Sequence, residues 1–354
     1  MASTKEVVKV GRVELQGFTT KVFEAAGMSS ENAGLAARAL VNADARGVES
    51  HGVARLAVYL DRIDKGGSSG SALPFISKEH GAIAVVDGNN ALGLVSGYFG
   101  MNKAIELATK FGIGAVSVKN SGHFGPAAEY ARIGAENSCI AISTTNVNTS
   151  MAPWGGIDPL LGNNPIALAA PTSRHPFVLD MALSTVARGK IRLADARGED
   201  IPLGWGLDSK GVPTTNPREA LEGLITPLGG PKGSALAMAV DVLCALLSGS
   251  PTSPGVRSQA IQDQPQHVSH FFLAIYVPAF VEMKQFLGDI DSMLEKIRKS
   301  TPAANVNKIY APGDIELEAE ESANKDGISL QVSTWNAMQD KSNKYGIELP
   351  ALIA

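Results

Sequence analysis

A histidine and an arginine stand four residues apart in the segment 43–60, which reads ADARGVESHGVARLAVYL. The apolar spacing predicts a helix over 51–63 with Ser50 as its N-cap. His51 and Arg55 would then share one helical face. An imidazole can move a proton near neutral pH, and a guanidinium grips a carboxylate through two parallel hydrogen bonds. This pairing suits a small 2-hydroxy or 2-oxo acid, and a solvated helix start with a surface arginine is the alternative.

A second histidine lies between glycines in the segment KNSGHFGPAAEYA (119–131). A predicted strand ends just before it and a predicted helix begins just after it, which is where α/β enzymes place working groups. Gly122 and Gly125 let the backbone come close to a ligand. His123 is therefore a candidate general acid or base, and a structural loop histidine is the alternative.

Neither standard phosphate-binding motif occurs in the chain. GIGAVS (112–117) has two of the glycines of G-x-G-x-x-G but Ser117 in the third position, and no GxxxxGK[ST] is present. The best phosphate candidate is PLGGPKGSALAMAVDVL (227–243), where a glycine-rich turn enters an apolar helix. Free N–H groups, the helix dipole and Lys232 would form an anion site there. The alternative is a helix-start turn with an exposed lysine.

Two further segments carry polar groups in apolar surroundings. The segment 145–171 is rich in Asn, Pro and Gly, and its amides could hold a nicotinamide carboxamide or a pyrophosphate; an ordered loop that merely packs is the alternative. Asp180 lies in the apolar run VLDMAL and needs a partner. It could orient a catalytic imidazole, or it could pair with an arginine.

The elements that must position these residues alternate in type along the middle of the chain. Helices are predicted at both ends, so we expect the chain ends to form one lobe and the strands between them a second. The predicted helices are 30–46, 51–63, 97–112, 126–138, 233–249 (buried all round), 280–299 and 328–347, and the predicted strands are 82–88, 112–120, 139–146, 165–172, 175–182 and 270–277.

Length and composition narrow the class of protein. A chain of 354 residues exceeds the usual size of a single core. The net charge of −4 and the absence of a basic arm argue against a nucleic-acid partner. No apolar run is long enough to span a membrane, and the N-terminus has no secretory signal. Cys139 and Cys244 sit in apolar runs without a CxxC, which indicates buried thiols in a reducing, cytoplasmic compartment.

Together these segments resemble the type-2 malate/L-lactate dehydrogenase family. Its pieces look like DxRGxxSHGxxR, SGHFG, APWGGxxPxLGxNPxAxAxP, LDMAxS, IPxGW, PxGGxKG and PGxIE. They stand here, in order from Asp44 to Glu316, as DARGVESHGVAR, SGHFG, APWGGIDPLLGNNPIALAAP, LDMALS, IPLGW, PLGGPKG and PGDIE. The resemblance implies a non-Rossmann nicotinamide-binding α/β fold with a largely antiparallel central sheet and a helical domain formed by the chain ends. Residues 1–80 with 310–354 would form the helical, substrate-side domain, and 81–309 the cofactor-binding domain of a homodimer.

The resemblance also implies roles for individual residues. His123 looks like the proton donor and acceptor, His51 and Arg55 look like substrate-side residues, and Ser50 supports them. Asp180 looks like a cofactor-facing or histidine-orienting group. The expected cofactor contacts are Asn146, Asp180, Met181, Ala182, Lys232, Gly233, Pro312, Gly313 and Asp314. Two departures stand out: Val147 and Asn148 replace serines that are common in the family, and Asp314 replaces a glutamate.

The expected reaction is hydride transfer between a small 2-hydroxy acid of the malate or L-lactate type and NAD or NADP. Alternatives within the family are a cyclic imine (piperideine-2-carboxylate) reductase and ureidoglycolate or sulfolactate dehydrogenases. From other classes, a non-catalytic binding protein and a zinc enzyme remain alternatives. The zinc ligands would come from His51, His123, His267 and His270. The sequence does not distinguish NAD from NADP.

Overall fold

A central seven-stranded sheet forms the core of the computed structural model, which describes residues 7–353. The strand order is β2-β3-β4-β11-β5-β6-β7, and every neighbouring pair is antiparallel except β3 with β4. The strands are β2 (Phe75–His80), β3 (Ile83–Asp87), β4 (Ile113–Ser121), β5 (Cys139–Thr145), β6 (Ile166–Ala170), β7 (Phe177–Met181) and β11 (Val268–Tyr276). The expectation of a mixed α/β fold with a largely antiparallel sheet is confirmed.

Helices cover both faces of this sheet. On one face pack α4 (Gly93–Phe111) and α5 (Ala127–Glu136). Gly100 of α4 lies so close to Phe272 and Val118 that an added Cβ would stand 2.6 Å from the phenyl ring. Ser117, the residue before Val118 in β4, points to the other face of the sheet. Its hydroxyl contacts the Cys244 carbonyl there at 3.5 Å.

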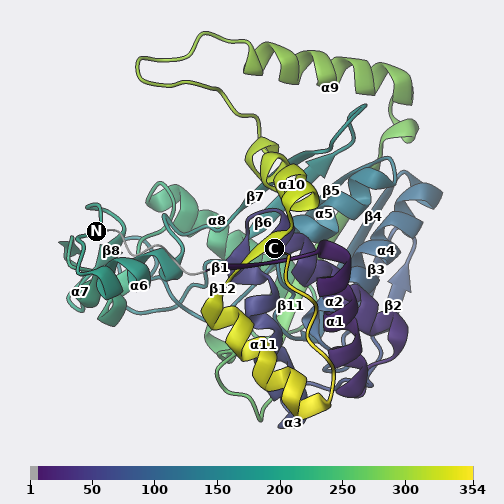
Figure 1. Cartoon of the computed structure of the whole chain (residues 1–354). Helices are drawn as coiled ribbons and strands as arrows, with labels where there is room; N and C mark the ends of the chain where they lie inside the picture. The colour runs from purple at the N-terminus through teal and green to yellow at the C-terminus, as the bar shows by residue number, and fades with distance from the viewer. Residues whose placement is uncertain (1–6, 354) are drawn as a thin grey trace.

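Two strands from near the two ends of the chain lie side by side next to the sheet (Figure 1). Strand β1 (Val7–Val10) pairs antiparallel with β12 (Ile328–Gln331). Around this pair lie α1 (Arg12–Ala25), α2 (Ser30–Ala45), α3 (Leu56–Asp64), α10 (Asp314–Asp326) and α11 (Val332–Tyr345). The Ser29 hydroxyl caps α2 by accepting the N–H of Asn32. The exact division into two domains stays a prediction.

Two parts of the chain extend away from this body in Figure 1. One is a small unit with its own short sheet and apolar cluster. It contains α6 (Arg188–Arg197), β8 (Gly206–Leu207), β9 (Pro213–Thr214), α7 (Pro217–Glu222) and β10 (Leu224–Ile225). The other is α9 (Met283–Arg298), the amphipathic helix that the sequence predicted, followed by a long extended segment.

The helix expected to be buried all round over 233–249 is only partly so. It is formed by α8 (Pro231–Asp241) and a π-helical turn, Val242–Leu246. One side packs on the sheet through Cys244, but Val242 is 50% and Leu246 60% exposed. The segment is apolar on all sides, and the sequence therefore predicted complete burial. In the structure one face of this helix remains uncovered.

Other boundaries also differ from the expectations. The helix predicted from residue 51 begins at Leu56, because Gly52 breaks it into two 3-10 turns, Glu49–His51 and Val53–Arg55. The predicted last helix over 328–347 is strand β12 followed by α11. The elements α1, β2 and α10 were not predicted. No described helix is both long and apolar enough to cross a membrane.

Candidate active site

A cavity of about 1050 Å³ opens between the chain-end helices, the sheet and the small unit. Nine of the residues expected at the site line it: Ser50, His51, Arg55, His123, Asp180, Met181, Ala182, Pro312 and Gly313. These residues come from four separate stretches of the sequence. The fold therefore gathers most of the candidate site into one hollow.

At one end of the cavity the two candidate histidines stack on each other. The ring centroids of His51 and His123 are 5.5 Å apart and the planes are inclined by 20°. Ser50 does not act as an N-cap; its hydroxyl contacts His51 Nδ1 at 2.9 Å. Arg55 donates from Nε to the Ser50 carbonyl at 2.8 Å and from Nη1 to Gln259 Oε1 at 3.3 Å. The 3-10 turns therefore bring together the residues that a helix was expected to align.

Asp44 of α2 holds this turn in place. Its Oδ2 accepts the N–H of Val53 at 2.7 Å. Gly52 lies directly on the same carboxyl, where a Cβ would fall 1.8 Å from Oδ1, so only glycine fits. Burial raises the pKa of Asp44 to about 8, with Glu49 adding to the effect and the Val53 N–H opposing it. Asp44 and Gly52, eight residues apart in the sequence, are thus in direct packing contact.

His123 is fixed by three groups, of which the sequence analysis named only Gly125, and as a residue that lets the backbone approach a ligand. Its Nδ1 contacts the Tyr59 hydroxyl at 2.6 Å and accepts the Gly125 N–H at 3.3 Å. Its own backbone N–H donates to Gln266 Oε1 at 3.0 Å. With Nδ1 engaged in this way, Nε2 is the nitrogen left to exchange a proton with a ligand. A tyrosine four residues after Arg55, within the predicted helix 51–63, was the signal that could have identified Tyr59.

Burial keeps both histidines neutral. It lowers the pKa of His51 to about 4, helped by the charge of Arg55. It also holds the pKa of His123 well below its usual value, with His51, Arg55 and His270 acting in the same direction. A neutral imidazole at working pH can accept a proton.

Asp180, in β7, lies against the start of α5 and has no described contact with a histidine. Its Oδ2 accepts the Ala128 N–H at 3.1 Å. Desolvation raises the pKa of Asp180 to about 6; Glu316 adds to this effect, whereas the Ala128 N–H and Arg46 oppose it. Asp180 therefore presents to the cavity a carboxyl group whose pKa is raised.

Four expected cofactor residues lie outside the cavity lining. Asn146 is fully buried and joins two loops: its Nδ2 donates to Pro251 O at 3.1 Å and its Oδ1 accepts the Ser269 N–H at 2.8 Å. Lys232 is exposed at the start of α8, and Gly233 packs on the Leu228 carbonyl. Asp314 pairs with Arg298 at 2.7 Å. Cofactor roles for these four remain predictions.

The histidines proposed as zinc ligands do not form a cluster. Over residues 7–353 no three His, Cys, Asp or Glu side chains are placed to hold a metal ion. Both ring nitrogens of His270 are engaged, at 2.8 Å each, by the hydroxyls of Thr145 and Ser121. His270 also stacks on the ring of Phe124, the residue that follows His123.

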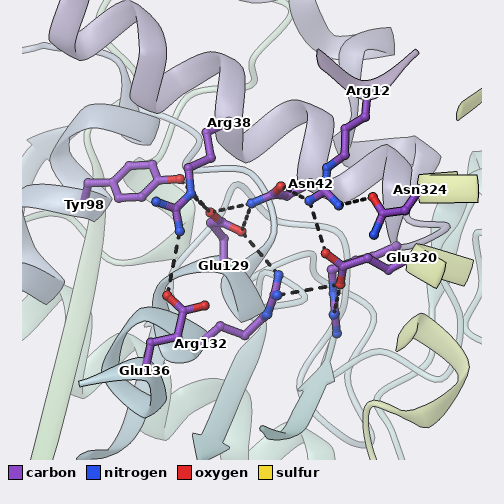
Figure 2. A network of polar contacts seen from close by, with 10 residues as sticks. Arg12, Arg38, Asn42, Tyr98, Glu129, Arg132, Glu136, Glu320 and Asn324 are labelled. Carbon is purple, nitrogen blue, oxygen red and sulfur yellow. Dashed lines mark hydrogen bonds and ion pairs between the residues drawn. The ribbon is translucent and has the colours of Figure 1, made fainter. Parts of the chain in front are cut away.

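A buried network of charges forms another wall of the cavity (Figure 2). Glu129 accepts from the Tyr98 hydroxyl at 2.6 Å and from Asn42 Nδ2 at 3.0 Å. Glu320 pairs with Arg46 at 2.9 Å and with Arg12 at 3.1 Å. Burial acts to raise the pKa of Glu320, but the surrounding arginines hold it below its usual value. The network joins α1, α2, α4, α5 and α10.

We predict that His51 makes a contribution to stability that falls as pH drops from 7 to 5. The pKa of His51 is about 4 in the folded chain and about 6.5 when unfolded, so between these values the unfolded state binds more protons at this residue. The contribution of His51 is therefore complete above pH 6.5 and is lost toward pH 4. His51→Asn should reduce the fall between pH 7 and 5 by roughly 1–2 kcal/mol.

Urea denaturation at both pH values and one protein concentration measures this difference. His175→Asn, at an exposed position, is the matched control and should follow the wild type. An equal fall in His51→Asn and wild type would contradict the burial of a neutral imidazole.

The chain is similar in sequence and in fold to known proteins. The family model described as malate/L-lactate dehydrogenase matches residues 10–339. A malate dehydrogenase of Pyrococcus abyssi is 38% identical over 349 residues, covering 96% of both chains. The solved structure of a malate dehydrogenase from Entamoeba histolytica superposes with a TM-score of 0.93 at 32% identity, over 98% of this chain and 100% of that one.

A third similar protein has another printed activity. The delta1-piperideine-2-carboxylate reductase of Pseudomonas syringae superposes with a TM-score of 0.83 at 28% identity, over 94% of this chain and 99% of that one. The family match spans nearly the whole chain, as the sequence resemblance implied. The chain belongs to the malate/L-lactate dehydrogenase family.

Proposed function

We propose that the protein transfers a hydride between a small 2-hydroxy acid, of the malate or L-lactate type, and NAD or NADP. The observation that carries this proposal is the convergence of His51, Arg55 and His123 in one cavity. One cationic fork and two neutral imidazoles suit a ligand with a carboxylate beside a hydroxyl or carbonyl group.

The cavity suits a dinucleotide together with a small acid. Its volume of about 1050 Å³ is at the upper end of the range for ligand pockets. Of the six buried side-chain atoms without a hydrogen-bond partner among the described residues, three belong to residues that line it: Arg132, Arg188 and Gln259. Asp180, Met181, Ala182, Pro312 and Gly313 would contact the cofactor. Because the sheet is mainly antiparallel and lacks the glycine fingerprint, the binding mode would not be that of a Rossmann fold.

In the proposed mechanism, each residue at the substrate end has one task. Bound nicotinamide supplies the hydride chemistry. Arg55, already oriented by the Ser50 carbonyl and Gln259, grips the substrate carboxylate. His123 Nε2 takes the hydroxyl proton in the oxidation direction and returns it in the reduction direction. His51 binds or polarises the C2 oxygen, and both rings are half-buried, which limits their contact with water.

A cyclic imine reductase is the second candidate, favoured by the structural similarity to the piperideine-2-carboxylate reductase. In that reaction His123 would protonate a ring nitrogen instead of an oxygen. Ureidoglycolate or sulfolactate oxidation also fits the same residues. The uncovered apolar face of α8 and its π turn supports a homodimer, and the buried free thiols Cys139 and Cys244 support a cytoplasmic location.

An assay of 2-oxo acids and cyclic imines with NADH and with NADPH tests the proposal. The panel should include oxaloacetate, pyruvate, sulfopyruvate and piperideine-2-carboxylate, and the loss of reduced cofactor is followed by absorbance. We expect turnover with at least one 2-oxo acid. Turnover of the imine alone would favour the second candidate, and no turnover of any substrate would contradict both.

We predict that His123→Ala lowers kcat by roughly 10²–10⁴-fold, the usual contribution of general acid–base catalysis. Cofactor binding should survive. In the wild type, kcat/KM for oxidation should rise with pH through an ionisation below the usual histidine pKa, because burial lowers the pKa of His123 and only the neutral ring accepts a proton. That ionisation should vanish in the variant. If His51→Ala removes it and His123→Ala keeps it, the two roles are reversed.

We predict that Arg55→Lys raises KM for the acid substrate by about tenfold or more and leaves the cofactor KM unchanged. Lysine keeps the charge but loses the planar fork that matches a carboxylate, and it cannot reproduce the contacts with the Ser50 carbonyl and Gln259. Steady-state kinetics with each substrate varied in turn measure both constants. A rise in the cofactor KM instead would assign Arg55 to the nucleotide.

A further inference from the structure

A pair of arginines lines the cavity at the edge of the small unit. They belong to ARGKIR (187–192), the segment that begins α6. Arg188 and Arg192 are four residues apart and share one helical face, and both contribute to the cavity lining. Lys190, between them, lies about 200° around the helix from Arg188, is exposed and is not part of the lining.

The positive charge of this pair is not compensated by the protein. Neither guanidinium forms an ion pair with a carboxylate of residues 7–353. Arg188 donates from Nη2 to the Leu221 carbonyl at 2.6 Å, and its Nε is buried without a partner. Burial, and then the charge of Arg192, lower the pKa of Arg188, as expected for two cations held close together.

Two other arginines that line the cavity have carboxylate partners. Arg46 pairs with Glu320 at 2.9 Å, and Arg132 lies 3.6 Å from Glu320 and 3.9 Å from Glu129. Their charges are satisfied by the buried network. In a chain with a net charge of −4, an uncompensated guanidinium pair facing a ligand-sized cavity indicates an anionic ligand group.

We propose that Arg188 and Arg192 form the subsite for a phosphate group of the dinucleotide cofactor, which rests on the function proposed above. Two guanidiniums offer several donors in the planar geometry that phosphate oxygens match. Arg188 follows the cavity-lining Met181 and Ala182 by only a few residues, so the subsite lies within reach of the residues expected to contact the cofactor. The phosphate is either the 2′-phosphate of NADP or the pyrophosphate that NAD and NADP share.

Equilibrium titration of the purified protein with NADPH and with NADH, followed by cofactor fluorescence, tests this subsite without requiring turnover. The variants are Arg192→Gln, Arg188→Gln and the matched control Lys190→Gln, which removes the same charge from the opposite face of α6. We expect Arg192→Gln to weaken binding by about tenfold or more, and Lys190→Gln to bind as the wild type does. Because Arg192 is exposed, its replacement keeps the test valid even if Arg188→Gln loosens the contact with Leu221.

The two nucleotides distinguish the two sources of the phosphate. A loss confined to NADPH assigns the pair to the 2′-phosphate, and an equal loss for both cofactors assigns it to the pyrophosphate. Wild-type affinity for both cofactors in Arg192→Gln, or an equal loss in Lys190→Gln, overturns the subsite while leaving the proposed function standing. Failure of the wild type to bind either nucleotide overturns the proposed function and the subsite together.

Discussion

Glu129, which is buried, and Glu320, which is half-buried, are carboxylates that lie where the chain-end helices meet the helix α5 that covers the sheet. A buried charge without partners is strongly destabilising, so each must be surrounded by donors. Tyr98, Asn42 and nearby arginines provide them for Glu129, and Arg12 and Arg46 provide them for Glu320. The groups that satisfy these two carboxylates come from both ends of the sequence and from its middle. Satisfying them fixes the position of α2 and α10 relative to the sheet, and with it one wall of the cavity.

The position of α2 determines the chemistry at the far end of the same cavity. Asp44, near the end of α2, holds the Val53 N–H and leaves room only for Gly52. The charge network therefore positions α2, and α2 in turn positions the turn that carries His51 and Arg55. The resulting enclosure desolvates both histidines and lowers the pKa of each, whereas it raises the pKa of Asp180 to about 6. One physical cause, removal of water, thus sets the protonation states of groups on both sides of the cavity.

The sequence predicted most of the central sheet and nine of the residues that line the cavity, because both leave local signals. Strands appear as apolar runs between turns, and His51, Arg55 and His123 stand in motifs whose residue types suit acid–base chemistry. Contacts between distant segments leave no such signal. Tyr59 was given no role by the sequence, because its contact with His123 depends on the packing of α3 against the loop after β4. Asn146 lies in a motif-rich loop, yet its amide is used to join Pro251 and Ser269.

The arginines show why residue type alone could not complete the site. Arg46, Arg132, Arg188 and Arg192 all line the cavity, and nothing in their local sequence separates structural from ligand-facing cations. The difference is whether the fold brings a carboxylate to them, which depends on residues such as Glu320 that lie far away in the chain. An arginine whose charge is matched inside the protein stabilises the fold and has little electrostatic attraction left for a ligand. One that lines the cavity without a carboxylate partner keeps a positive field that attracts an anionic ligand. The partition of charge in this cavity therefore assigns its carboxylate-paired arginines to the architecture and its unpaired arginines to binding.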